Sequence, residues 1–345
     1  MRRRHHVPAI SLAVVGPEGV RLAAGFGTAD LHSGAAATPA TQFLWFSMSK
    51  IVTATAAMTL VDAGRLDLDT PAAEYVDCLR APGTAQPTTR QLLNHTSGLA
   101  NPLPIRWAHQ AGGDAPAPTD LLRRQMQRRR VHRHPVGQAA RYSNLGYLAA
   151  GEVISAAAGE PFERYVIEHV LRPAGISGTG FVYRTDDPVA TGYVRAPRAA
   201  TPALRALLPS GVVGRREGRY LALNRFYVDG PSYGGLVGDV VDAARFVQLH
   251  LGDGTIDGRE VLSAEASRAM RVLDQAGKPF DHGLGWFRRP TTGDGDWVEH
   301  FGAGVGFWNL MRLDPARGLG VVMMSNSTTS YDFEPVCQLI TDEYC

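Results

Sequence analysis

Lysine is almost absent from this 345-residue chain. Only two of its 35 basic residues are lysines, Lys50 and Lys278, and the other 33 are arginines. Arginine can serve wherever only a positive charge is needed, but a base has to release its proton. Near neutral pH that costs lysine about 4 kcal/mol and arginine at least about 7 kcal/mol. A lysine retained in such a chain is therefore a candidate for proton transfer.

Cysteine is also scarce. Cys78, Cys337 and Cys345 have neither C-x-x-C spacing nor a histidine at metal-ligand spacing. The sequence therefore predicts no disulfide framework and no zinc site. We expect neither a metal nor an organic cofactor.

Charge and hydrophobicity narrow the classes of partner. The net charge is +2 and 20% of residues are charged, which gives no bulk electrostatic reason to expect a nucleic acid or a membrane as partner. The densest basic run, Arg123 to His134, has no interleaved aromatic residues and is typical of a solvated helix face. No apolar run approaches the ~18 residues that span a bilayer, and residues 1–15 lack a signal-peptide core. We expect a cytoplasmic protein.

The two ends of the chain have strand-like sequence patterns, whereas the middle has helical ones. Residues 9–28 predict a β-hairpin through the turn at residues 16–19, and residues 282–325 hold four further strand candidates. Residues 331–344 could form a closing helix. Residues 62–230 instead read as helices broken by Pro/Gly-rich loops. The pattern indicates an α/β sheet built from both chain ends, with a mostly helical region inserted.

The most informative stretch is Ser47-Met48-Ser49-Lys50, at the start of an Ala- and Thr-rich segment with apolar residues at helical spacing. Residues three apart share a helix face, so the Lys50 amine should reach the Ser47 hydroxyl. That pair is a nucleophile beside a possible base.

Two further stretches carry polar side chains at alternate positions. Tyr142 and Asn144 would point the same way from an extended loop, and His300 and Gly302 from a strand, where the glycine would leave room for a substrate backbone. A buried phenol can pass protons and an amide can orient a substrate. Taken alone, the first stretch is more typical of a surface turn, and a lone histidine on a strand is more often a structural residue.

Residues 91–99, QLLNHTSGL, have no catalytic spacing. Their short hydroxyls and imidazole before a glycine predict a loop tied by its own hydrogen bonds. We expect this loop to have a structural role near the site.

Together these stretches resemble the serine β-lactamase and penicillin-binding-protein-like hydrolases, the SxxK enzymes, and more narrowly their class C β-lactamase and esterase branch. Ser47 to Lys50 matches the first motif, Tyr142-Ser143-Asn144 the second, and His300-Phe301-Gly302 the third, where the branch has K-T-G or H-x-G. GRLDLDTP at 64–71 and LLNHTSGL at 92–99 also match in order, so the resemblance covers nearly the whole chain.

The resemblance implies an α/β fold of the α+β type, with an antiparallel sheet flanked by helices. Residues 1–61 and 234–345 would form the sheet domain and residues 62–233 a mostly helical domain, with the active site between them. Ser47 would be the acylated nucleophile, Lys50 its base and Tyr142 the proton partner of Lys50. Backbone N–H groups of Ser47 and Ala303 would hold the oxyanion, and Asn144, His300 and Gly302 would contact the substrate.

Two departures from the family pattern matter. Only residues 1–7 precede the first strand, where family members usually carry a helix. His300 stands where β-lactamases and carboxypeptidases have a lysine that holds a substrate carboxylate, and a mostly neutral imidazole does this less well.

We therefore expect a small-molecule ester, amide or lactam substrate and favour an esterase acting on small carboxylic esters or amides. A β-lactamase or D-amino-acid peptidase and a biosynthetic acyltransferase or cyclase remain alternatives. Apolar residues within 195–232 would form the substrate wall or pack in the core. The oligomeric state stays open.

Overall fold

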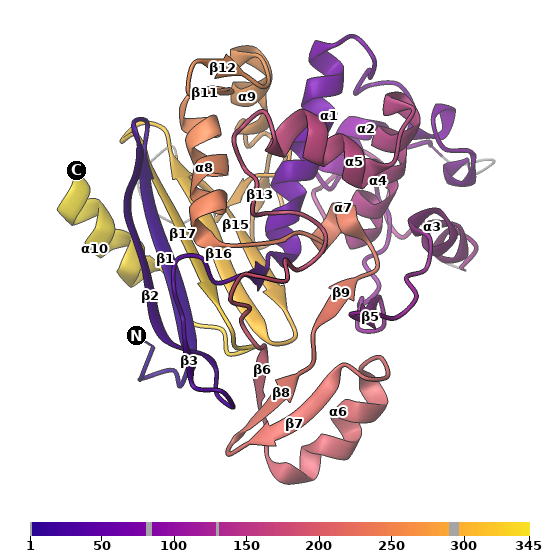
Figure 1. Cartoon of the computed structure of the whole chain (residues 1–345). Helices are drawn as coiled ribbons and strands as arrows, with labels where there is room; N and C mark the ends of the chain where they lie inside the picture. The colour runs from indigo at the N-terminus through magenta and orange to yellow at the C-terminus, as the bar shows by residue number, and fades with distance from the viewer. Residues whose placement is uncertain (1, 81–84, 129–130, 290–296) are drawn as a thin grey trace.

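A central antiparallel sheet joins the two ends of the chain (Figure 1). The computed structural model describes residues 2–80, 85–128, 131–289 and 297–345. The sheet order is β13-β14-β15-β16-β17-β1-β2-β3. Its strands are β1 (Ala9–Gly16), β2 (Gly19–Asp30), β3 (Ala35–Ala36), β13 (Asp281–His282), β14 (Phe287–Arg288), β15 (Val298–Gly304), β16 (Phe307–Asp314) and β17 (Leu319–Ser325). Because β1 pairs with β17, with Ile10 opposite Ser325, the sheet closes only when both ends are in place.

Both faces of the sheet are covered at its centre, which is why β1 is buried along almost its whole length. Successive side chains of a strand point to opposite faces. Ala13 and Val15 belong to the main core with helix α8 (Val240–Leu251). Ile10 and Val14 belong to a second core with helix α10 (Glu334–Tyr344), which packs on the other face.

Helix α1 (Ser49–Asp62) is buried on nearly all sides and stands between the sheet and a helical layer (Figure 1). A helix apolar all round is a core element rather than a surface one. Its neighbours include α4 (Asn144–Ala158), α7 (Pro231–Gly234) and α9 (Ala264–Met270). The remaining helices of this layer are α2 (Thr89–Leu93), α3 (Pro118–Met126) and α5 (Phe162–Val166), with the short turns η2 (Ala72–Glu74), η3 (Asp77–Leu79) and η4 (Ile167–Leu171).

The inserted region is not only helical. Strands β6 (Tyr193–Arg195), β8 (Tyr220–Leu223) and β7 (Val213–Glu217) form a separate sheet that, with η5 (Arg198–Ala200) and α6 (Thr201–Leu207), makes a lobe at the lower end of Figure 1. We call residues 193–228 the lobe. Short two-stranded pairs complete the structure: β4 (Phe43–Leu44) with β10 (Val237–Gly238), β5 (Ala108–Gln110) with β9 (Phe226–Val228), and β11 (Thr255–Ile256) with β12 (Arg259–Glu260).

The predicted α/β class with an antiparallel sheet and flanking helices is confirmed. The hairpin predicted at residues 9–28 is β1 and β2, and the closing helix is α10. Among the described residues, no helix combines the length and hydrophobicity needed to cross a bilayer.

Candidate active site

Ser47 lies in a 3-10 turn, η1 (Phe46–Met48), immediately before α1 rather than inside it. The preceding residue, Phe46, has a φ of 47°, a left-handed conformation that costs a residue with a side chain about 1–3 kcal/mol. The Phe46 ring packs against Phe226 and Phe307, contacts that hold this conformation. The N-terminus of α1 therefore directs its backbone N–H groups towards the region of Ser47, where negative charge is favoured.

Lys50 is completely buried and makes three hydrogen-bond contacts through Nζ. Its amine lies 3.1 Å from Ser47 Oγ, 2.8 Å from Asn144 Oδ1 and 2.7 Å from the Tyr233 carbonyl oxygen. The predicted approach of Lys50 to Ser47 is thus present in the structure.

The protonation state of Lys50 follows from its partners. Burial lowers the pKa of Lys50 well below its ordinary value, because no carboxylate among the described residues compensates for the lost solvation. A neutral amine has two protons and one lone pair. The oxygens of Asn144 and Tyr233 can only accept, so they take the two protons, and the lone pair faces the one partner that can donate, the Ser47 hydroxyl. The three contacts therefore suit an amine acting as a base.

Tyr142 lies on the other side of this pair. Its ring centroid is 4.9 Å from Lys50 Nζ. Burial raises the pKa of the Tyr142 phenol well above its ordinary value, and its hydrogen bond with Ser47 offsets part of that rise. Tyr142 is therefore a neutral phenol at pH 7. It can donate its proton, and its oxygen can hold an additional proton only transiently.

Asn144 is placed by the start of α4. Ser143 is the N-cap of that helix, its Oγ accepting from the Gly146 N–H at 2.9 Å. The Asn144 backbone N–H donates to Asn101 Oδ1 at 3.0 Å. The middle residue of the second motif is thus a capping residue, and the cap fixes the direction in which Asn144 reaches Lys50.

His300 on β15 is buried and neutral. Its Nδ1–H donates to the Phe301 carbonyl oxygen at 2.8 Å, which leaves a lone pair on Nε2. Nε2 is buried and has no hydrogen-bond partner among the described residues. Burial lowers the pKa of His300 well below its ordinary value, and any charge that Lys50 takes up would lower it further. His300 therefore presents no positive charge at pH 7.

The space beside Gly302 is filled by the chain itself. A Cβ at Gly302 would lie 2.1 Å from the Trp45 carbonyl oxygen, two residues before Ser47. The absence of a side chain lets β15 approach the Ser47 turn closely. The close approach of the Trp45 carbonyl is therefore enough to require a glycine here, and no substrate backbone needs to be invoked.

Two further histidines, His95 and His282, lie beside Tyr142, and no sequence spacing links them to it. The ring of His95 lies 4.5 Å from that of Tyr142 and 4.9 Å from that of His282. The Ser143 N–H donates to His95 Nδ1 at 3.2 Å. Burial lowers the pKa of His282 to about 4 and that of His95 well below its ordinary value. The loop around His95 is tied by its own hydrogen bonds, as predicted, with Thr96 donating to Asn94 Oδ1.

A pocket of about 240 Å³ opens beside Ser47. Among its lining residues are Ser47, Asn144 and Ala303, three of the predicted site residues, together with the apolar side chains of Trp107, Leu208 and Phe226. No described lining residue carries a charge. Typical small-molecule sites occupy about 300–1,000 Å³, so this pocket suits a small neutral group.

The described residues contain no group of three or more His, Cys, Asp or Glu side chains placed to hold a metal ion.

Comparison with known proteins gives one consistent family. The family model described as Beta-lactamase matches residues 1–340. Penicillin-binding protein 4 of Amycolatopsis lactamdurans is 27% identical over 96% of this chain and 84% of its own length. The D-alanyl-D-alanine-carboxypeptidase/endopeptidase AmpH of Escherichia coli K12 is 24% identical over 86% of this chain and 74% of its own length.

Solved structures share the fold. The structure of SurE superposes with a TM-score of 0.77 at 29% identity, covering 99% of this chain and 73% of SurE. EstCE1, described as a hydrolase with promiscuous acyltransferase activity, superposes with a TM-score of 0.73 at 21% identity, covering 94% of this chain and 90% of EstCE1. The names of AmpH and EstCE1 give different activities within one family and fold, so the substrate has to be argued from the site.

Proposed function

This chain belongs to the β-lactamase family of serine hydrolases, and we propose that it cleaves small, neutral carboxylic esters or amides through an acyl-enzyme on Ser47. The observation that carries the proposal is the absence of any charged side chain among the described residues lining the pocket beside Ser47. A substrate carboxylate placed there would lose its hydration without gaining a cation.

Acylation would begin with transfer of the Ser47 proton to the Lys50 lone pair, across the 3.1 Å contact. Ser47 Oγ then bonds to the substrate carbonyl carbon, and the carbonyl oxygen takes the negative charge. The backbone N–H groups of Ser47 and Ala303, both residues of the pocket wall, would stabilise that oxyanion. As the carbon–leaving group bond breaks, the proton on Lys50 passes to the departing alcohol or amine, with the Tyr142 phenol as relay.

Deacylation would repeat these steps with water. Lys50, neutral again, takes a proton from water through Tyr142, and the hydroxide bonds to the acyl carbon. The Ser47 ester bond breaks, and Ser47 recovers its proton from Lys50. The product acid then leaves the pocket, whose described lining residues include no cation to retain it.

We also propose that the active site lies between two domains, residues 1–61 with 234–345 and residues 62–233. Ser47, Lys50 and His300 come from the first, and Tyr142 and Asn144 from the second. The hydrogen bond from Lys50 to Asn144 crosses this boundary and supports placing the site there.

A carboxypeptidase or β-lactamase activity is the main alternative, since AmpH is named as a carboxypeptidase. Such an enzyme has to hold a substrate carboxylate. His300 is neutral because burial lowers its pKa, so the third motif lacks the cation that this task favours.

The test is a substrate panel on one preparation. We expect turnover of p-nitrophenyl acetate and butyrate, and little or none of nitrocefin or of D-alanyl-D-alanine peptides. Ser47→Ala should lose the esterase activity, whereas Ser49→Ala, a serine two residues away, should retain it. Efficient hydrolysis of nitrocefin or of the D-alanyl peptides, with esters ignored, would overturn the ester assignment while leaving the role of Ser47 intact.

A further inference from the structure

The net charge of +2 conceals a strong segregation of charge. Residues 195–225 contain seven arginines and a single acidic residue, Glu217, a formal charge of +6 within 31 residues. The rest of the chain is therefore net negative. The basic segment is also one structural unit, because it makes up most of the lobe.

Four of these arginines gather around one hollow of about 600 Å³. Its wall includes Arg195, Arg198, Arg216 and Arg219, with Thr329 from the main body of the protein, and no described lining residue is acidic. The volume lies within the range of small-molecule sites, about 300–1,000 Å³. The hollow is distinct from the pocket beside Ser47 and shares no lining residue with it.

The arginines of this hollow are not neutralised by the protein. Within the described chain, Arg195, Arg198 and Arg219 make no ion pair or side-chain hydrogen bond. Glu217, the one acid of the segment, pairs instead with Arg215 at 2.6 Å and lies near His32. Several like charges held together without a counter-ion repel one another, and an anion relieves that repulsion.

One guanidinium is held in place. Arg216 donates to the carbonyl oxygen of Ala196 at 2.9 Å and to Thr201 Oγ1 at 2.7 Å. These bonds tie β7 to the segment that carries Arg195 and Arg198. Arg216 therefore fixes the wall and contributes charge, while the three unpaired arginines keep their donors free.

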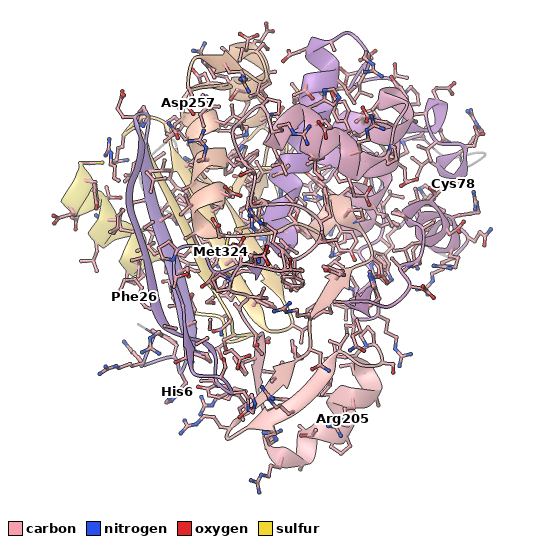
Figure 2. The ribbon with its side chains drawn as sticks, in the orientation of Figure 1. His6, Phe26, Cys78, Arg205, Asp257 and Met324 are labelled. Atoms are coloured by element: carbon pink, nitrogen blue, oxygen red, sulfur yellow. The ribbon has the colours of Figure 1, made fainter. Side chains whose placement is uncertain are left out.

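The N-terminal segment adds charge at the same end of the molecule. The Tyr220 hydroxyl donates to the His6 carbonyl oxygen at 2.7 Å, which joins residues 2–6, with Arg3 and Arg4 exposed, to the lobe. Figure 2 shows His6 and Arg205 at this lower end, where nitrogen-tipped side chains project outwards.

We propose that this hollow binds a phosphate-type dianion, on a soluble phosphate or on a lipid headgroup. Guanidinium groups match phosphate oxygens in geometry and can engage them with two parallel hydrogen bonds. Thr329 offers a hydroxyl to a further oxygen. The site is independent of the hydrolase chemistry and adds a second binding function to the chain.

The experiment uses the full chain with two probes at about 150 mM salt, where long-range attraction is screened beyond about 8 Å. Inorganic pyrophosphate is titrated by calorimetry, and vesicles of phosphatidylcholine alone or mixed equally with phosphatidic acid, whose phosphomonoester can carry two negative charges, are tested by sedimentation. Binding of pyrophosphate assigns the site to soluble phosphates. Binding only of the phosphatidic acid vesicles assigns it to lipid headgroups.

The variant Arg195→Gln/Arg198→Gln/Arg219→Gln should weaken binding at least about tenfold, since each lost charge-assisted bond contributes about 1.5–3 kcal/mol before screening. The matched control is Arg123→Gln/Arg124→Gln/Arg128→Gln, which removes the same charge from the exposed basic run at α3 and should bind as the parent does. All variants should react with a fluorophosphonate at the parental rate, which checks folding and keeps this test separate from the proposed hydrolase function. No binding of either probe, or equal loss in the control, would overturn the proposal.

Discussion

Lys50 Nζ lies 2.8 Å from Asn144 Oδ1, although the two residues are 94 positions apart in the chain. The bond joins the start of α1 to the start of α4 and holds the amine beside Ser47. It also brings a neutral side chain, rather than a carboxylate, against the buried lysine. The low pKa of Lys50 depends on this partner being uncharged.

Asn144→Asp should therefore change the pH dependence of catalysis. A carboxylate at this distance favours the charged amine and raises the pKa of Lys50 by about 1–3 units. Since the active form is the neutral amine, the acidic limb of the kcat/KM profile should move to higher pH by that amount. Asn224→Asp makes the same chemical change on the lobe and should leave the profile in place. An unshifted profile in Asn144→Asp would mean that Lys50 is not the titrating base.

Lys50→Arg should keep the charge and lose the base. Arginine cannot give up its proton near neutral pH, and general-base catalysis contributes about 100- to 10,000-fold to rates. The rate of fluorophosphonate labelling should fall by that factor. Lys278→Arg changes the other lysine, which is exposed, and should label at the parental rate. Labelling of Lys50→Arg at an undiminished rate would remove Lys50 from the mechanism.

Leu208→Ala should enlarge the pocket beside Ser47. Leu208 is buried and lines that pocket, so truncation removes part of its wall. The ratio of kcat/KM for a longer p-nitrophenyl ester, such as octanoate, to that for acetate should rise in the variant. The increase should be up to about tenfold, because the enlarged pocket accommodates more methylene groups. The neighbouring Leu207 is 48% exposed and lies outside the lining, so Leu207→Ala is the matched control. Unchanged chain-length preference in Leu208→Ala would place the acyl group elsewhere.

His282 should make the fold sensitive to acid. Burial lowers its pKa to about 4, from an ordinary value of about 6.5. Between these values the unfolded chain binds a proton that the folded chain does not, so stability present above about pH 6.5 is lost as the pH falls towards 4. At pH 5 the loss due to this residue is about 2 kcal/mol.

Urea unfolding of the parent and of His282→Gln at pH 7 and pH 5 measures this effect. The drop in the free energy of unfolding between the two pH values should be about 2 kcal/mol smaller in the variant. His32→Gln, at an exposed histidine, should behave like the parent. If His282→Gln loses as much stability as the parent does, another group carries the acid sensitivity.

The sequence predicted those features that depend on local spacing. The hairpin of β1 and β2, the strand β17 and the contact between Lys50 and Ser47 follow from periodicity within a few residues. The family resemblance, which the family model confirms over residues 1–340, predicted that Tyr142, Asn144 and His300 lie in one site.

What escaped prediction depends on contacts between distant residues or on backbone atoms. The approach of His95 and His282 to Tyr142 has no signature in any one segment. The Tyr233 carbonyl that holds Lys50 is a backbone group, which any residue type could supply. Strands β6 and β7 of the lobe were missed because they are short and contain arginines, without clear alternation of apolar and polar residues.

The central claim is that Ser47 is the acylated nucleophile, and intact-protein mass spectrometry tests it most directly. After brief incubation with a fluorophosphonate or an activated ester, the parent and Ser49→Ala should each gain one adduct, and peptide mapping should place it on Ser47. Ser47→Ala should gain none. An adduct of equal yield on Ser47→Ala, or one mapped to another residue of the parent, would contradict the mechanism.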